Sequence, residues 1–160
     1  MAKTTCASIV LSALGGFLLA SPAYATGTGA CSLNAKSASG TYGFAGEGAA
    51  TANTQFAPAG AVVQSGTVTQ AVTSVSGQTL SGTWSVTLTQ NDSSGYHANV
   101  QFGGHFQANA STCQGDFYVD APVKLTNPAF HVVFVDDGDG LRTVSLIPDL
   151  FLDYPTARKL

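Results

Sequence analysis

Strict alternation of apolar and polar side chains is the feature that most constrains the fold of this chain. In residues 79–89 one face carries Thr and Ser, and the other carries Leu80, Gly82, Trp84, Val86 and Leu88. In residues 96–109 one face carries His, Asn and Gln, and the other carries Tyr96, Ala98, Val100, Phe102, Gly104, Phe106 and Ala108. Because successive side chains of a β-strand point to opposite faces, this period of two predicts strands with one buried and one solvated face.

Further strand signals recur at short spacing. We expect strands at 40–44, 113–119 and 148–160, a hairpin over 130–147, and a strand at 61–75 whose apolar face carries Val63, Val68 and Val72. Residues 46–58, which are rich in Gly, Ala, Asn and Thr, are expected to form a loop. No segment shows a helical period. The pattern predicts an all-β fold of about eight antiparallel strands, either a barrel or a sandwich. Glycines within strands, above all Gly103 and Gly104, favour the coiled sheet of a small barrel.

Residues 1–25 have the pattern of a secretory signal peptide. Lys3 supplies the positive charge, residues 9–20 are apolar, and Ala23-Tyr24-Ala25 is a cleavage site of the Ala-x-Ala type. The apolar run is shorter than the roughly 20 residues that a membrane-spanning helix needs. We therefore expect an exported protein, secreted or periplasmic, with a single β-barrel domain over 26–160 and no membrane span after cleavage.

Cysteine usage agrees with export. The chain has three cysteines, and Cys6 belongs to the signal peptide. Two cysteines remain, Cys31 and Cys113, and in an exported protein they predict one disulfide, with two unpaired buried thiols as the alternative. The bridge would close a loop of about 80 residues, which a chain-entropy argument values at roughly 4 kcal/mol.

The charge pattern excludes one class of partner. The chain has 6 basic and 9 acidic residues, and no charged residue lies between Glu47 and Asp92. Without a basic patch, nucleic acid is not an expected partner. The sequence also contains no Gly-x-Ser-x-Gly motif and no glycine-rich phosphate loop before a helix.

The densest acid cluster lies inside the expected hairpin. Asp136, Asp137 and Asp139 alternate with Gly138 and Gly140. Calcium binds several carboxylate oxygens arranged in this way, but no glutamate follows at the spacing of an EF-hand. Asp-Gly is also a preferred hairpin turn. We expect a turn, with a calcium site as the alternative and no other cofactor.

Aromatic residues on the expected inner faces are candidates for the wall of a ligand cavity, since a small barrel can hold one ligand inside. They are Trp84, Phe102, Phe106, Phe130 and Phe134, and the alternative is that they form plain core. Glu47 is the one glutamate of the chain. Buried in such a cavity it would be a candidate acid or base, whereas in a loop it would be a solvated charge.

Short motifs occur in a recognisable order: Cys31, Gly40-Thr-Tyr-Gly-Phe44, Leu80-Ser-Gly-Thr83, Cys113-Gln-Gly115, and Phe134-Val-Asp136 followed by a Gly turn and Leu141-Arg142. Together they resemble a largely uncharacterised family of small exported bacterial proteins. In general build that family is similar to the calycin and allene-oxide-cyclase-like barrels. The resemblance implies the barrel and the Cys31–Cys113 pairing, and it implies no catalytic residue. The acidic residues 136–140 depart from the typical turn of the family.

These observations lead to a functional expectation. We expect a barrel that binds a small apolar molecule and is not an enzyme. The alternatives are an isomerase or cyclase of the allene-oxide-cyclase-like type and a structural or adhesive surface protein. An open cavity with a buried acid would favour the cyclase, an open cavity without one would favour the carrier, and a filled interior would favour the structural role.

Overall fold

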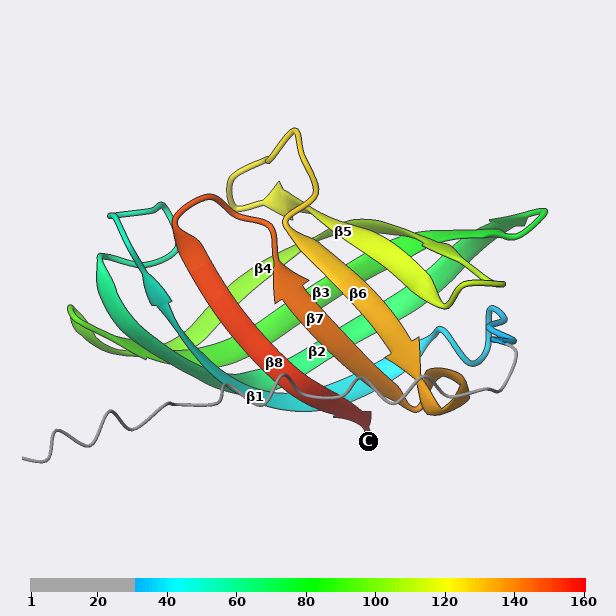
Figure 1. Cartoon of the computed structure of the whole chain (residues 1–160), viewed down its shortest axis with the longest axis horizontal. Helices are drawn as coiled ribbons and strands as arrows, with labels where there is room; N and C mark the ends of the chain where they lie inside the picture. The colour runs from blue at the N-terminus through cyan, green and yellow to red at the C-terminus, as the bar shows by residue number, and fades with distance from the viewer. Residues whose placement is uncertain (1–30) are drawn as a thin grey trace, which may run out of the picture.

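The chain folds into a closed β-barrel. The computed structural model describes residues 31–160, so the expected signal peptide lies outside the described residues. Each strand pairs antiparallel with the next in sequence, and the last strand returns to pair with the first (Figure 1). The elements are β1 (Gly40–Ala50), β2 (Gly60–Ser76), β3 (Thr79–Asp92), β4 (Gly95–Asn109), β5 (Gln114–Ala121), β6 (Phe130–Val135), the 3₁₀ turn η1 (Asp136–Gly138), β7 (Gly140–Ser145) and β8 (Leu150–Lys159). The predicted eight-strand antiparallel barrel is confirmed.

The barrel has two differently built ends. In Figure 1 the long strands β2, β3 and β4 form one wall, and the shorter strands β5 to β8 cross in front of it. We call one end the loop end, because it carries the connections 51–59, 93–94, 122–129 and 146–149. We call the other the arm end, which carries residues 31–39, 77–78, 110–113 and 136–139. Among residues 31–160 no helix is long and apolar enough to cross a membrane.

The faces of β3 agree with the predicted alternation. Leu80, Gly82, Trp84, Val86 and Leu88 are all buried. On β2 the expected face is wrong at one end: Val62 is fully buried, whereas Val63 is 52% exposed. The inner face of β2 continues through Gln64 and Gln70, which are 4% and 2% exposed. The first strand also extends to Ala50, so the expectation of a loop from residue 46 is wrong for residues 46–50.

Two irregularities interrupt the pairing of β4 with its neighbours. The pairing with β5 shifts between Gly103 and Gly104, as the glycine pair predicts. A side chain at Gly104 would collide with the backbone carbonyl of Tyr118, so only glycine allows this approach. The pairing with β3 shifts between Leu88 and Gln90, next to Asn99 with φ of 57°. An unpaired residue in a strand reverses the faces beyond it.

The consequence at the start of β4 is a reversal of the expected face. Tyr96, predicted to face inward, is 70% exposed. His97 pairs with the buried Gln90 and therefore lies on the inner side, while His105 pairs with the exposed Thr83. The two histidines, expected on one polar face, lie on opposite faces.

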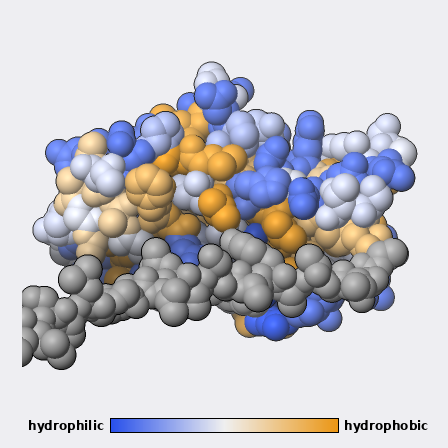
Figure 2. Space-filling model, viewed as in Figure 1, coloured by the Kyte–Doolittle hydropathy of each residue, from blue (hydrophilic) through white to orange (hydrophobic). Residues whose placement is uncertain are grey.

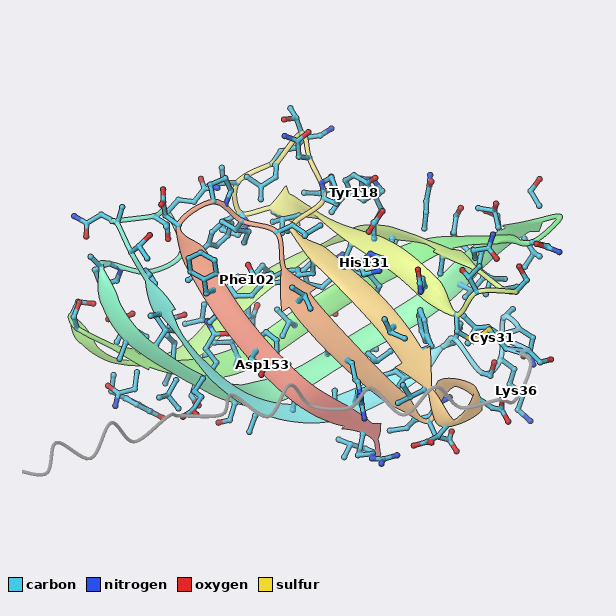
Figure 3. The ribbon with its side chains drawn as sticks, viewed as in Figure 1. Cys31, Lys36, Phe102, Tyr118, His131 and Asp153 are labelled. Carbon is cyan, nitrogen blue, oxygen red and sulfur yellow. A yellow bond between two sulfur atoms is a disulfide. The ribbon has the colours of Figure 1, made fainter. Side chains whose placement is uncertain are left out.

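The arm end is closed by residues 31–39. A disulfide joins Cys31 to Cys113, as predicted, with 5.7 Å between the two Cα atoms. Figure 3 labels Cys31 at this end, beside the turn before β5. Ala38 is fully buried, and its carbonyl accepts a hydrogen bond of 2.7 Å from the side chain of Gln70. The buried hydroxyl of Tyr42 donates to the carbonyl of Gly138 at 2.7 Å, which ties the first strand to η1. Any opening for a ligand must therefore lie elsewhere.

Candidate ligand cavity

The barrel interior contains an apolar cavity of about 70 Å³. Its wall comes from β1 to β8, so residues distant in the sequence meet there. It is lined by Phe44, Val68, Trp84, Val86, Leu88, Phe102, Phe117, Phe130, Val132, Leu141, Thr143, Tyr154 and Ala157. None of these described lining residues carries a charge at neutral pH, and the polar side-chain groups on the wall belong to Trp84, Thr143 and Tyr154. The arrangement suits a compact and mostly apolar occupant.

A second, smaller cavity of about 20 Å³ lies next to it toward the loop end. Phe102, Phe130 and Tyr154 line both cavities and thus form a partition between them. The smaller cavity is also lined by Phe56, Gln64, Val119, Ile147, Leu150 and Leu152. Phe56 belongs to the β1–β2 loop and meets Phe102 edge to face, with 6.1 Å between ring centroids. The loop end therefore covers the cavities with aromatic rings that are only half-buried.

The five aromatic residues predicted to line a cavity divide into two groups. Trp84, Phe102 and Phe130 lie on the wall of the larger cavity. Phe106 and Phe134 are buried in the core and line neither cavity. Phe106 instead stacks on Phe117, at 5.1 Å between ring centroids. Figure 3 labels Phe102.

Trp84 is firmly held at the cavity. Its indole N–H donates to the carbonyls of His105 and Tyr118, each at 3.1 Å. Both acceptors lie beside the Gly103–Gly104 irregularity, where the β4–β5 pairing shifts. The indole therefore has a fixed orientation, and its ring forms part of the cavity wall.

A buried chain of polar side chains borders the partition, and the alternation pattern did not predict it. The hydroxyl of Tyr154 donates to the side-chain oxygen of Gln64. The amide of Gln64 donates to the oxygen of Gln90 at 2.6 Å. The amide of Gln90 donates to the carboxylate of Asp92 at 2.6 Å and to the backbone carbonyl of Phe56 at 3.0 Å. This chain connects the interior to the β3–β4 hairpin and to the β1–β2 loop.

The two ends of this chain have opposite pKa shifts. Burial raises the pKa of the Tyr154 phenol far above its ordinary value, so the phenol keeps its proton. The pKa of Asp92 lies well below its ordinary value, because its carboxylate accepts hydrogen bonds from the Ser94 hydroxyl, the Gln90 amide, the Ser94 backbone N–H and His97. These donors leave its side chain 1% exposed. Asp92 is thus an ionised acceptor at neutral pH.

Asp92, Ser94 and His97 do not form a catalytic triad. In such a triad one imidazole nitrogen contacts the serine while the other contacts the aspartate. Here Nε2 of His97 lies 2.9 Å from the Ser94 hydroxyl and 3.4 Å from the Asp92 carboxylate, so one nitrogen faces both. The Ser94 hydroxyl itself donates to Asp92 at 2.6 Å. The cluster stabilises the hairpin turn.

Glu47 does not lie in the cavity. It is exposed on the outer face of β1, where it pairs with Val63 of β2 and Asp153 of β8. The expected loop position was wrong because the Gly-Glu-Gly segment continues the strand, at a shift in the β1–β8 pairing. An acid or base acting inside the barrel is therefore not supplied by Glu47.

The acidic residues 136–140 form the turn of the predicted β6–β7 hairpin. Asp136, Asp137 and Asp139 are exposed, and Asp136 pairs with Arg158 of β8. Gly138 is buried against the carbonyl of Ser37, with φ of +95°. Among residues 31–160 no group of three or more His, Cys, Asp or Glu side chains is placed to hold one metal ion. The geometry fits a hairpin turn that packs against residues 31–39 and holds them in place.

The outer faces carry two further Asp–His pairs. His105 contacts Asp120 at 2.7 Å, and His131 contacts Asp116 at 2.8 Å, each through Nδ1. Tyr118 lies between them on β5 and stacks on His105, with 4.7 Å between ring centroids. Figure 3 labels Tyr118 and His131 on neighbouring strands. Figure 2 shows that apolar residues gather on this face of the barrel, over β6, β7 and the β7–β8 loop.

Comparisons of the chain with protein-family models, with curated proteins and with solved structures found no match. The assignment of the fold as a barrel rests on the strand pairing of this chain alone.

Proposed function

We propose that the protein is an exported binding protein that takes up a small, mostly apolar molecule inside its barrel. The observation that carries this proposal is the apolar cavity bounded by Trp84, Phe102 and Phe130. Apolar cavities of this kind remain dry and accept apolar guests. No acidic side chain among the described residues lines the cavity, which favours a carrier over the cyclase alternative.

The size of the cavity limits the ligand. A volume of about 70 Å³ is far below the several hundred Å³ of usual drug-sized sites. A ligand larger than a short-chain alcohol would require rotation of Phe102 or Phe130, which would join the two cavities. We propose that ligands enter through the loop end, past Phe56, because the arm end is closed.

The proposal includes an exported location and a kinship with small exported barrels. The disulfide is compatible with an oxidising compartment. Kinship rests on the ordered motifs and on the eight-strand build. We expect a small molecule, rather than nucleic acid, as the partner. Intact mass spectrometry of protein recovered from the periplasm or medium tests this location. A mass that matches a chain beginning at Thr26 would establish export and cleavage.

Trp84 supplies the test of ligand binding, because it is the one tryptophan of the chain and lies on the cavity wall. We expect small alcohols and hydrocarbons to change its fluorescence saturably. Val68→Phe places a ring into the cavity and should remove this response. Val63→Phe on the outer face of the same strand is the matched control and should keep it. Native mass spectrometry should detect a co-purified small molecule. The absence of both signals across a size series of compounds would contradict the proposal.

A further inference from the structure

The direction of hydrogen-bond donation along the buried chain of Tyr154, Gln64, Gln90 and Asp92 is fixed at its outer end, where Gln90 contacts Asp92. Gln90 directs its N–H groups to the Asp92 carboxylate at 2.6 Å and to the Phe56 carbonyl at 3.0 Å. A carboxylate and a backbone carbonyl can only accept hydrogen bonds. Rotating the Gln90 amide by half a turn would place its oxygen against these two acceptors. Its nitrogen therefore faces them, and its oxygen faces Gln64.

The orientation of the Gln90 amide determines the direction of the hydrogen bonds further inside the barrel. The oxygen of Gln90 can only accept, so Gln64 must present its N–H group across the 2.6 Å contact. The oxygen of Gln64 then faces Tyr154, whose hydroxyl donates to it. Because Gln64 and Gln90 are only 4% and 5% exposed, bulk water does not compete for these groups. The one proton of the Tyr154 hydroxyl is thus committed to Gln64.

We propose that Tyr154 offers the ligand only a hydrogen-bond acceptor, so that the cavity selects small molecules with a hydroxyl or N–H donor over ethers and other molecules that only accept. This inference rests on the proposed function, and it names the chemical class of the ligand. Tyr154 lines both cavities and stands in the partition between them. A hydroxyl that already donates one hydrogen bond keeps lone pairs for a donor.

The size of the preference follows from the cost of an unmade hydrogen bond. An acceptor-only ligand placed against the phenolic oxygen would bury its own acceptor without a donor, because the Tyr154 proton is already given to Gln64. A buried group left without a partner lowers the affinity by a factor of about 5 to 150, so we expect a difference of about tenfold between matched ligands. Thr143, on the same wall, has a hydroxyl that can donate as well as accept, so it would mask the effect. The test uses Thr143→Val to remove it.

The test compares 1-butanol with its isomer diethyl ether, using the Trp84 fluorescence of the full chain. In Thr143→Val we expect the alcohol to bind about tenfold more tightly. Adding Tyr154→Phe should bring the two affinities together, whereas Tyr96→Phe, which removes an outer hydroxyl, should leave the preference intact. Circular dichroism of each variant checks folding, and if Tyr154→Phe does not fold, the isomer comparison in Thr143→Val decides alone.

The outcomes separate the inference from the proposed function. Equal binding of both isomers, or tighter binding of the ether, would overturn the inference while leaving a binding protein. No saturable response to either isomer or to any other small apolar compound would overturn the proposed function itself.

Discussion

Removing the disulfide is a stringent test of how the barrel is stabilised. The perturbation is the double substitution Cys31→Ser with Cys113→Ser. The bridge joins residues 82 positions apart. In the chain-entropy model, a loop of this length restricts the unfolded chain by about 4.5 kcal/mol at 25 °C. This is a large share of the roughly 5–15 kcal/mol by which a domain is stable.

The native state should change little in that variant. Residues 31–39 keep their other contacts with the barrel. Leu33 is 5% exposed and its N–H donates to the Ala110 carbonyl at 3.1 Å, and the side chain of Gln70 donates to the carbonyl of Ala38. The effect should therefore appear mainly through the unfolded chain. We expect the fluorescence of folded Trp84 to be unchanged.

Urea unfolding followed by Trp84 fluorescence measures the effect. We expect a loss of about 4.5 kcal/mol and a larger dependence on urea, since the unbridged chain exposes more surface on unfolding. Reducing the wild-type bridge should give the same loss. A loss below about 1 kcal/mol, or an altered signal of the folded protein, would refute the argument that the bridge acts on the unfolded state.

Three further perturbations follow from the structure. Asp92→Asn should lower the free energy of unfolding by about 1–3 kcal/mol at neutral pH. Because folding lowers the pKa of Asp92, its stabilisation is full above the unfolded pKa near 4 and is lost as the pH falls through the folded pKa. Urea unfolding should therefore show the stabilities of the two proteins converging in acid. Gly104→Ala should cost at least about 2 kcal/mol, because its Cβ would meet the Tyr118 carbonyl, whereas Gly43→Ala, which meets only the exposed side chain of Leu160, should be neutral or raise the thermal midpoint. Calcium should leave the thermal midpoint within error of that measured in a chelator, because the three carboxylates of the 136–140 turn are exposed and one of them pairs with Arg158; a clear rise would restore the calcium alternative.

The regular parts of the fold were predictable because a period of two marks them directly. The inward face of β3, the irregularity at Gly103 and Gly104, and the last strand that closes the barrel all follow from the sequence pattern. The errors lie where the period is interrupted. The irregularity beside Asn99 reverses the faces at the start of β4, and no pattern of residue types marks it.

The polar part of the candidate site was missed for a different reason. Gln64 and Gln70 are buried on the same face as Val62, yet a polar residue in an alternating strand is assigned to the solvent side. Their even spacing with Val62 and Val68 was the one available signal. The apolar wall was partly predictable, since Trp84, Phe102 and Phe130 lie on it, but Tyr154 meets them only after barrel closure.

The order of the strands also determines when the barrel can form. Seven of the eight strand pairs join neighbours in the sequence, and the eighth joins β1 to β8, with Tyr42 opposite Lys159. A chain that ends before Leu150 would leave the edges of β1 and β7 unpaired, and such edges recruit strands from other chains. The ten residues of β8 are therefore required for closure, and we expect a chain that lacks them to aggregate instead of forming the barrel.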